Sequence, residues 1–194
     1  MRSKGFIGLV LLLVVVLAAG CVGCGVRNSL TEQQEEVSRA WADVQAQYQR
    51  RANLIPNLVT TVRRAESFDR DLIDAVSTAE DRVKQFGDDL DASRTEQYLD
   101  AQRSLGRSLE RLLAETENVP QLASVEAFRS LQDQIEGTEN RIAVAHRDYN
   151  GAVSKFNARV RKFPVNIVAF LTGFHKITPF QAEAGAENAP EVNL

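Results

Sequence analysis

The sequence predicts an all-α protein: an antiparallel up-down four-helix bundle with long helices, preceded by an N-terminal membrane anchor helix. Apolar residues recur every three or four positions through most of the chain, which is typical of helices that bury one face. Helix-forming residues dominate the composition, and glycine and proline are sparse. Residues 1–26 are mostly apolar, whereas the rest of the chain is rich in charged side chains.

Residues 1–26 are expected to form the membrane anchor. The stretch from Gly5 to Val26 contains no charge, and a helix of that length, rising about 1.5 Å per residue, crosses the roughly 30 Å hydrocarbon core. A lipoprotein-type signal is the alternative, because residues 17–21 (LAAGC) resemble the lipobox, in which a small residue precedes a lipidated cysteine. The lipidation candidates are then Cys21 and Cys24.

The basic residues Arg2 and Lys4 set the expected orientation of the chain. Positive residues beside an apolar stretch tend to stay on the cytoplasmic side, so the body that follows is expected outside the cytoplasm. Both kinds of anchor agree on this orientation. The predicted localisation is therefore the cell membrane, with a single N-terminal anchor and an extracytoplasmic body.

Four helices are predicted in the body, which spans residues 27–176. Their limits follow from the apolar spacing and from residues that begin or end helices. The predicted helices cover residues 27–52, 55–86, 94–117 and 124–163, and a short apolar piece follows at residues 165–174. Residues 177–194 are expected to be a disordered acidic tail, because small and acidic side chains bury too little apolar surface to fold.

Pro56 leaves the first boundary open to two interpretations. We place a turn at residues 53–55, because Asn53 can cap a new helix that has Pro56 in its first turn. Arg50 and Arg51 would then lie at the C-terminus of the first helix, where positive charge is favourable. The alternative is one long helix kinked at Pro56, since the apolar spacing continues through the proline.

The remaining boundaries rest on caps and prolines. Gly87 is placed to form the C-cap of the second helix, and Pro120 follows the end of the third. Ser124 can cap the N-terminus of the fourth helix. Pro164 is expected to stop the fourth helix, because proline cannot continue the backbone hydrogen bonds.

The composition argues against several classes of function. The formal net charge is −3 and the pI is about 5.5, whereas a nucleic-acid binder would carry a basic surface, so no nucleic-acid partner is expected. His146 and His175 belong to no metal-binding motif, and we expect no metal, no cofactor and no enzymatic activity. For Glu136 and Glu139, an ExxE pair on the fourth helix, a solvated or capping role is favoured over metal binding.

Polar residues beside the apolar face of the fourth helix form a candidate network. Asparagine at such positions fixes the register in which helices pair, so a structural role is favoured. A face that binds a partner is the alternative. The residues of this predicted network are Asn140, Arg147, Tyr149, Asn150 and Asn157.

A second candidate site is the apolar block at the end of the fourth helix. If the body starts at the membrane and turns three times, this helix delivers the block back to the bilayer. Basic residues beside large apolar side chains suit a headgroup interface. The alternative is that the block caps the open end of the bundle. The membrane-interface candidates are Phe163, Ile167, Phe170, Leu171, Phe174, Arg161 and Lys162.

Three stretches of the chain resemble proteins of the LemA family. They are residues 49–59 (QRRANLIPNLV), residues 138–150 (TENRIAVAHRDYN) and residues 156–174, which include RKFPVNIVA and a closing Gly-Phe. The resemblance implies an antiparallel helical bundle on a membrane anchor, with no established enzymatic activity. It also implies links with membrane proteases and with membrane remodelling in magnetosome formation. Orientation stays open on this ground, since some members have the short N-terminus outside.

The predicted function is that of a membrane-tethered helical interaction or scaffold protein of the bacterial envelope. It would be non-enzymatic and an accessory to membrane proteases or membrane remodelling, with the membrane and other envelope proteins as partners. A structural homo-oligomer formed through exposed helix faces is one alternative. An enzyme with an unrecognised site in the bundle is the other.

Overall fold

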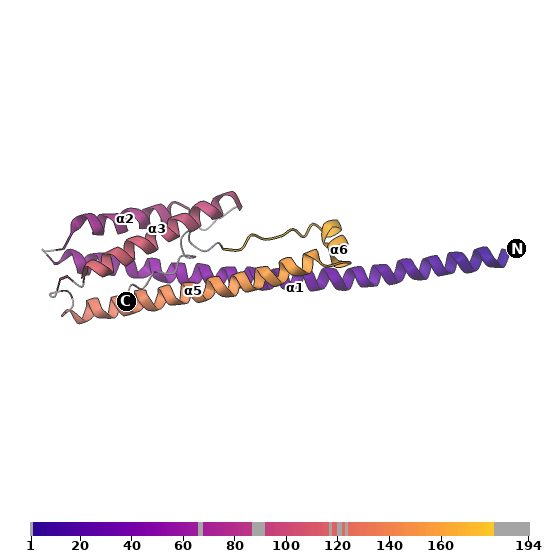
Figure 1. Ribbon diagram of the computed structural model, residues 1–194, viewed down its shortest axis with the longest axis horizontal. Helices are drawn as coiled ribbons and strands as arrows, with labels where there is room; N and C mark the ends of the chain where they lie inside the picture. Colours follow the sequence, from indigo (N-terminus) through magenta and orange to yellow (C-terminus); the bar gives the residue numbers. More distant parts are fainter. Residues whose placement is uncertain are drawn as a thin grey trace, which may run out of the picture. The chain divides into compact units, whose positions relative to one another are not determined.

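The computed structural model describes the backbone of residues 2–65, 68–86, 92–116, 118–119, 122 and 124–180. Side chains of residues 2–12, 14–19, 21–22 and 92–93 lie outside this description. The described residues form helices and no strand, so the all-α fold class is confirmed for this part of the chain. The helices are α1 (Arg2–Arg63), α2 (Arg70–Lys84), α3 (Ala92–Thr116), α5 (Glu126–Arg161) and α6 (Val165–Thr172), as shown in Figure 1.

The chain divides into two compact units. The first unit consists of Met1–Ala42 and His146–Leu194, and the second unit consists of Asp43–Ala145. The two longest helices, α1 and α5, each contribute one part to each unit. The up-down four-helix arrangement of the body as a whole stays a prediction.

One hydrophobic core occupies the second unit. It draws on α1, α2, α3 and α5 and on the segments that connect them. The shorter helices α2 and α3 lie side by side (Figure 1). Burial of this apolar surface is the main force that holds the helices of the unit together. The core consists of Ile55, Leu58, Val62, Phe68, Ile73, Val76, Ala79, Leu105, Leu109, Leu112, Val119, Leu122, Phe128 and Ile135.

The turn predicted at residues 53–55 is wrong, because α1 continues through Pro56 to Arg63. Proline removes one backbone hydrogen bond and costs about 3 kcal/mol in a helix interior. Ile55 and Leu58 are fully buried, and their burial is lost if the helix ends before them. Asn53 does not begin a helix; its Oδ1 accepts a 3.1 Å hydrogen bond from Gln49 Nε2, one turn earlier.

The chain turns instead between Arg63 and Arg70, a break that sequence reasoning did not predict. Asp69 is the N-cap of α2, with an extended backbone and a side chain that accepts a 2.9 Å hydrogen bond from the Asp71 amide. Phe68, which directly precedes this cap, is buried in the core. The helix predicted over residues 55–86 is therefore divided between the end of α1 and α2.

The later boundaries agree with the sequence within about two residues, the usual uncertainty of helix ends. α5 ends at Arg161, just before Pro164. α6 ends at Thr172, and its C-cap is Gly173, whose left-handed backbone (φ 80°) suits glycine because it has no Cβ. Gly87, predicted as the C-cap of the second helix, lies outside the described residues.

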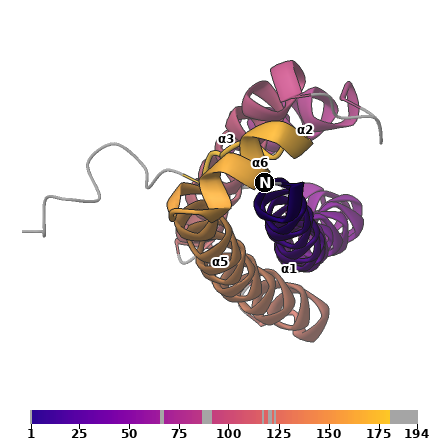
Figure 2. The same ribbon diagram turned by 90° about the vertical axis from the view of Figure 1, so that its right-hand side faces the viewer.

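The first unit contains the N-terminal part of α1, the C-terminal part of α5 and α6, and α1 contacts α5 through Trp41 and Tyr149. In Figure 1 the segment that follows α6 runs back along α5, and Figure 2 shows α6 at the end of α5. This segment, residues 174–180, has no regular secondary structure. Among the described side chains, the buried apolar residues of the unit are Leu30, Val37, Tyr149, Ala152, Val153, Phe156, Val160, Val165 and Ala169.

Most side chains of the predicted anchor, residues 1–26, lie outside the described residues. Among the described residues, no helix combines the length and the apolar character needed to cross a bilayer. Of the two lipidation candidates, Cys24 is exposed and carries a free thiol. The side chain of Cys21 lies outside the described residues.

Candidate functional site

Four large apolar side chains in and beside α6 form an exposed surface, which we call the α6 patch. Phe163 and Phe170 expose 81% and 80% of their surface. Val165 and Ala169 of the same helix are buried. A cluster of exposed apolar side chains is uncommon on monomeric soluble proteins and is typical of interaction surfaces. The α6 patch consists of Phe163, Ile167, Phe170 and Leu171.

Phe174, the fifth apolar candidate for the membrane interface, lies differently. It is only partly exposed, and its ring packs against that of the buried Phe156, with centroids 6.3 Å apart. Its backbone amide donates a 2.9 Å hydrogen bond to the carbonyl of Ala169. Phe174 therefore stabilises the end of α6 and is not part of the α6 patch.

The α6 patch lies in a basic stretch of the sequence. Residues 149–182 contain no aspartate or glutamate, and they carry several lysines and arginines. Lys155 pairs with Glu36 of α1, with Nζ and Oε1 3.3 Å apart. Arg161, Lys162 and Lys176, which flank α6, are all exposed. Exposed cations thus border the α6 patch on both sides along the chain.

Two members of the predicted polar network, Asn150 and Asn157, bind the backbone of the segment that follows α6. Asn157 accepts a 2.9 Å hydrogen bond from the amide of Ile177 and donates one of 2.7 Å to its carbonyl. Asn150 does the same with Phe180, at 2.8 and 3.1 Å. We call this pair of asparagines the Asn clamp. Each side-chain amide uses both its donor and its acceptor on one backbone residue.

The ring of Phe180 lies in an aromatic pocket formed by α1 and α5. It stacks on His146 with centroids 4.2 Å apart, and lies 4.8 Å from Tyr149 and 5.7 Å from Trp41. Trp41 and Tyr149 also contact each other, at 5.7 Å. Burial raises the pKa of Tyr149 above its ordinary value. We call Trp41, His146 and Tyr149 the aromatic pocket.

The structure does not bring the five residues of the predicted network together. Asn140 and Arg147 are exposed, and Tyr149 belongs to the aromatic pocket. Asn150 and Asn157 bind an extended segment through their side-chain amides, and their role in fixing helix register stays a prediction. The same contacts order residues 177–180, which the sequence placed in a disordered tail; residues 181–194 lie outside the description.

A buried polar cluster in the second unit centres on Arg51, which is 2% exposed. Its Nη1 donates a 2.8 Å hydrogen bond to Glu139 Oε1, and its Nη2 donates to both the backbone and the side-chain oxygen of Gln102. Gln102 in turn donates a 2.8 Å bond to the hydroxyl of Tyr98. Arg51 therefore connects α1, α3 and α5, and the predicted place of Arg51 at a helix C-terminus is wrong.

Two tyrosines line this cluster, and both ionise less readily than free tyrosine. The guanidinium of Arg51 lies 5.3 Å from the ring centre of Tyr48. Burial raises the pKa of Tyr48 strongly, and the positive charge of Arg51 only partly offsets it. Burial also raises the pKa of Tyr98. The cluster thus holds its tyrosines neutral, as expected for a structural role.

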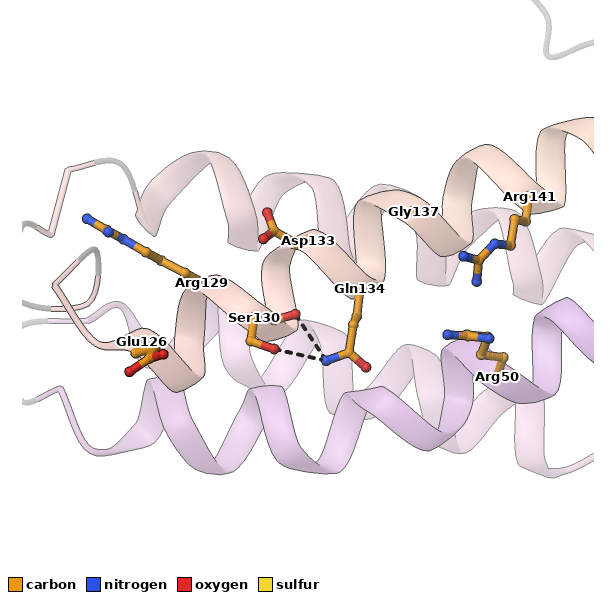
Figure 3. A pocket seen from close by; sticks show the side chains of 8 residues that line it. All are labelled: Arg50, Glu126, Arg129, Ser130, Asp133, Gln134, Gly137 and Arg141. Carbon is orange, nitrogen blue, oxygen red and sulfur yellow. Dashed lines mark hydrogen bonds between the residues drawn. The ribbon is translucent and has the colours of Figure 1, made fainter.

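An open hollow of about 430 Å³ lies on the second unit, along α5 (Figure 3). Figure 3 shows Arg50 of α1 and Arg141 of α5 extending toward each other across it, while Gln134 bonds to Ser130 of its own helix. The remaining lining residues carry both signs of charge. Among the residues whose side chains are described, no group of three or more His, Cys, Asp or Glu is placed to hold a metal ion.

Comparison with known proteins identifies the family. The profile of the LemA family matches residues 40–194. The chain belongs to the LemA family. This LemA protein is 28% identical over 182 residues to Magnetosome protein MamQ 1 and to Magnetosome protein MamQ 2 of Paramagnetospirillum magneticum. It is 24% identical over 180 residues to Magnetosome protein MamQ of Magnetospirillum gryphiswaldense. Each alignment covers 82% of this chain and 66% of the relative, just under two thirds of its length.

The three stretches that resemble LemA proteins supply most of these sites. Residues 49–59 carry Arg51, and residues 138–150 carry Glu139 and Asn150. Residues 156–174 carry Asn157 and the whole α6 patch. The LemA stretches thus provide the Arg51–Glu139 ion pair of the second unit, and the Asn clamp and the α6 patch of the first unit.

Proposed function

We propose that this LemA protein is a non-enzymatic helical protein of a membrane surface, attached at two points. Residues 1–26 form one attachment, and the α6 patch docks in the headgroup region as the other. The exposure of the α6 patch carries this proposal. The body is proposed to be an up-down helical bundle that presents its surface to other envelope proteins, as an accessory to membrane proteases or membrane remodelling.

Docking of the α6 patch is favourable in both its apolar and its charged parts. Burying a large apolar side chain contributes about 1.5–3 kcal/mol relative to leaving it in water. Arg161 and Lys162 lie beside Phe163, where each cation gains about 1 kcal/mol near an anionic membrane surface. An apolar helix face bordered by basic residues is the usual design of interfacial helices.

The first attachment has two chemical forms that mass spectrometry separates. A spanning helix keeps the residues before Gly5, so the mature protein purified from membranes begins at the original N-terminus. Lipidation at Cys21 or Cys24 leaves a shorter chain that begins with a diacylglycerol-modified cysteine. An unmodified chain that begins after residue 26 and stays in the membrane would show that the α6 patch alone is sufficient for attachment.

The relatives support a role at a membrane without assigning one. They are named as magnetosome proteins, which agrees with the expectation that the family takes part in membrane remodelling in magnetosome formation. Because this chain spans only 66% of their length, their activities and partners are not transferred to it. The proposal rests on the α6 patch and its basic border.

Photo-crosslinking in native membranes tests the docking of α6. Benzoylphenylalanine in place of Phe170, in the full-length chain, is expected to form adducts with lipid acyl chains. The control places the same group at Ser154, an exposed position on α5. It is expected to give at least about fivefold less lipid adduct, because only the group at position 170 would lie among the lipid acyl chains. Equal labelling at the two positions would contradict the proposal.

The same experiment distinguishes the second candidate function, a structural homo-oligomer. An exposed apolar surface of this kind is also covered when two copies associate through it. Adducts from position 170 to a second copy of the chain, in place of lipid, would favour the homo-oligomer. The charge-reversed pair Arg161→Glu and Lys162→Glu is expected to lower the lipid adduct, because it replaces attraction to anionic headgroups with repulsion.

A further inference from the structure

The spacing of the Asn clamp matches the spacing of an extended peptide. Asn150 and Asn157 are seven residues apart, which is about 10 Å along the axis of α5. Ile177 and Phe180 are three residues apart, which is about 10 Å along an extended chain. Two asparagines two helical turns apart therefore bind two backbone positions of one extended segment. Such contacts involve the backbone alone and place no demand on the side chains at those positions.

The aromatic pocket adds side-chain selectivity to this backbone recognition. The second clamped residue, Phe180, contacts Trp41, His146 and Tyr149. Aromatic contacts at these distances stabilise a complex beyond the effect of area burial. The site therefore suits an extended segment that has an aromatic residue three positions after the first clamped residue.

All the residues that form this site lie on α1 or α5, and the segment that occupies the site contributes none of them. Trp41 lies on α1, and the other four residues lie on α5, within the first unit. Residues 174–180 have no regular secondary structure and meet the site as a ligand would. An identical segment from a second copy makes identical contacts, which is the condition for exchange between copies.

We propose that the Asn clamp and the aromatic pocket form a binding site for extended peptides. Residues 177–180 occupy the site within one chain, and the same segment of a second copy occupies it between chains. The ligand class is an extended segment with an aromatic residue three positions after the first clamped residue, as in Ile177-Thr-Pro-Phe180. This inference does not depend on whether the α6 patch docks on a membrane.

The first test uses full-length chains in nanodiscs and a fluorescein-labelled peptide of residues 174–180 as the probe. The acceptor carries Ile177→Pro, which removes the amide that Asn157 Oδ1 accepts and leaves the site itself unchanged. Phe180→Ala serves as a second acceptor, because it empties the aromatic pocket. Both changes lie outside the helices. We expect saturable binding that is at least about tenfold tighter to each acceptor than to the unmodified chain, whose site is already occupied.

Changes in the site identify where the peptide binds. In the Ile177→Pro chain, Asn150→Ala or Asn157→Ala is expected to weaken binding at least about tenfold, because each loses two hydrogen bonds. Asn140→Ala, the same substitution at an exposed position of α5, is expected to leave binding unchanged. Failure of both acceptors to bind, with their helical circular dichroism intact, would overturn the proposal. Peptide binding that is unchanged by both Asn150→Ala and Asn157→Ala would also overturn it.

Exchange between copies is tested by complementation. The Ile177→Pro chain has an intact site and a disabled segment, whereas the Asn157→Ala chain has an intact segment and a weakened site. A photo-crosslinker at Thr178 of the Asn157→Ala chain is expected to capture the Ile177→Pro chain when the two share a nanodisc. Loss of this adduct on adding Asn150→Ala and Asn157→Ala to the acceptor supports the assignment. An undiminished or absent adduct refutes exchange.

Discussion

Arg51 on α1 and Glu139 on α5 lie 88 positions apart in the chain and form a 2.8 Å ion pair. The pair is asymmetric: the Arg51 side chain is 3% exposed and that of Glu139 is 40% exposed. The buried guanidinium depends on its partner more than the carboxylate does, because an unpaired buried charge is strongly unfavourable. Glu139 therefore holds a buried arginine while its own side chain stays partly solvated, a pairing that the sequence did not predict.

Removing the negative charge of this pair should destabilise the protein. Glu139→Gln keeps the shape and an acceptor but leaves Arg51 without a counter-charge, and we expect a loss of about 1–2 kcal/mol in the free energy of unfolding. Glu136→Gln, at the exposed partner of the ExxE pair, should change stability by less than about 0.5 kcal/mol. Urea denaturation followed by circular dichroism measures both. Equal effects would show that the ion pair contributes nothing.

Gly106 leaves space for the Arg51 side chain, and substituting alanine at position 106 should crowd it. A Cβ at Gly106 would lie 3.3 Å from Arg51 Nη1, whereas one at Gly151 would meet nothing within 4 Å. Gly151→Ala should therefore stabilise α5 by about 0.5–1 kcal/mol through helix propensity. Gly106→Ala should gain less or lose stability, because it crowds a hydrogen-bonded guanidinium. Thermal unfolding of the two variants gives the comparison, and a full gain at Gly106 would contradict it.

The Asn clamp should protect two backbone amides in a segment without secondary structure. The amides of Ile177 and Phe180 donate to Asn157 and Asn150, so they should exchange hydrogen more slowly than that of Thr178 between them. Asn157→Ala should abolish the protection at Ile177. Asn140→Ala is the matched control. Exchange measured by NMR tests this, and rapid exchange at Ile177 in the unmodified chain would show that the clamp is open.

The tyrosines should make the protein less stable in alkali. The pKa values of Tyr48, Tyr98 and Tyr149 are all raised above 10.0 in the folded chain, chiefly by burial. Below pH 10 the hydroxyls are neutral in both states, so their contribution to stability is fully present. Above that pH the unfolded chain ionises first, and stability falls as the pH rises toward the folded-state pKa values.

Absorbance at 295 nm measures this titration directly. The folded chain should ionise at higher pH than the chain in denaturant, where tyrosine has its ordinary pKa. Tyr48→Phe should reduce the fall in stability between pH 10 and pH 12, because burial raises the pKa of Tyr48 the most among the three tyrosines. Identical titration curves in the folded and denatured chains would contradict the burial of the three hydroxyls.

The boundary at Pro56 shows where local signals were not sufficient. Asn53 and Pro56 together form a convincing helix start, yet the helix continues because Ile55 and Leu58 extend the buried face of α1. The true break at Asp69 has a capping aspartate, but neither glycine nor proline appears beside it. An N-cap signal has the same appearance whether or not the core continues past it. Only packing against the other helices distinguishes the two sites.

The sequence by itself determined the helical composition, the stop at Pro164 and the apolar block that became α6, because these depend on periodicity and on proline within a few residues. Tertiary structure decided what Arg51, Asn150 and Asn157 do. Each acts on a partner far away in the chain, Glu139 for the arginine and the segment after α6 for the asparagines. Local periodicity cannot encode such contacts, since a polar residue at the edge of an apolar face has the same pattern whether it meets water, a helix or an extended segment.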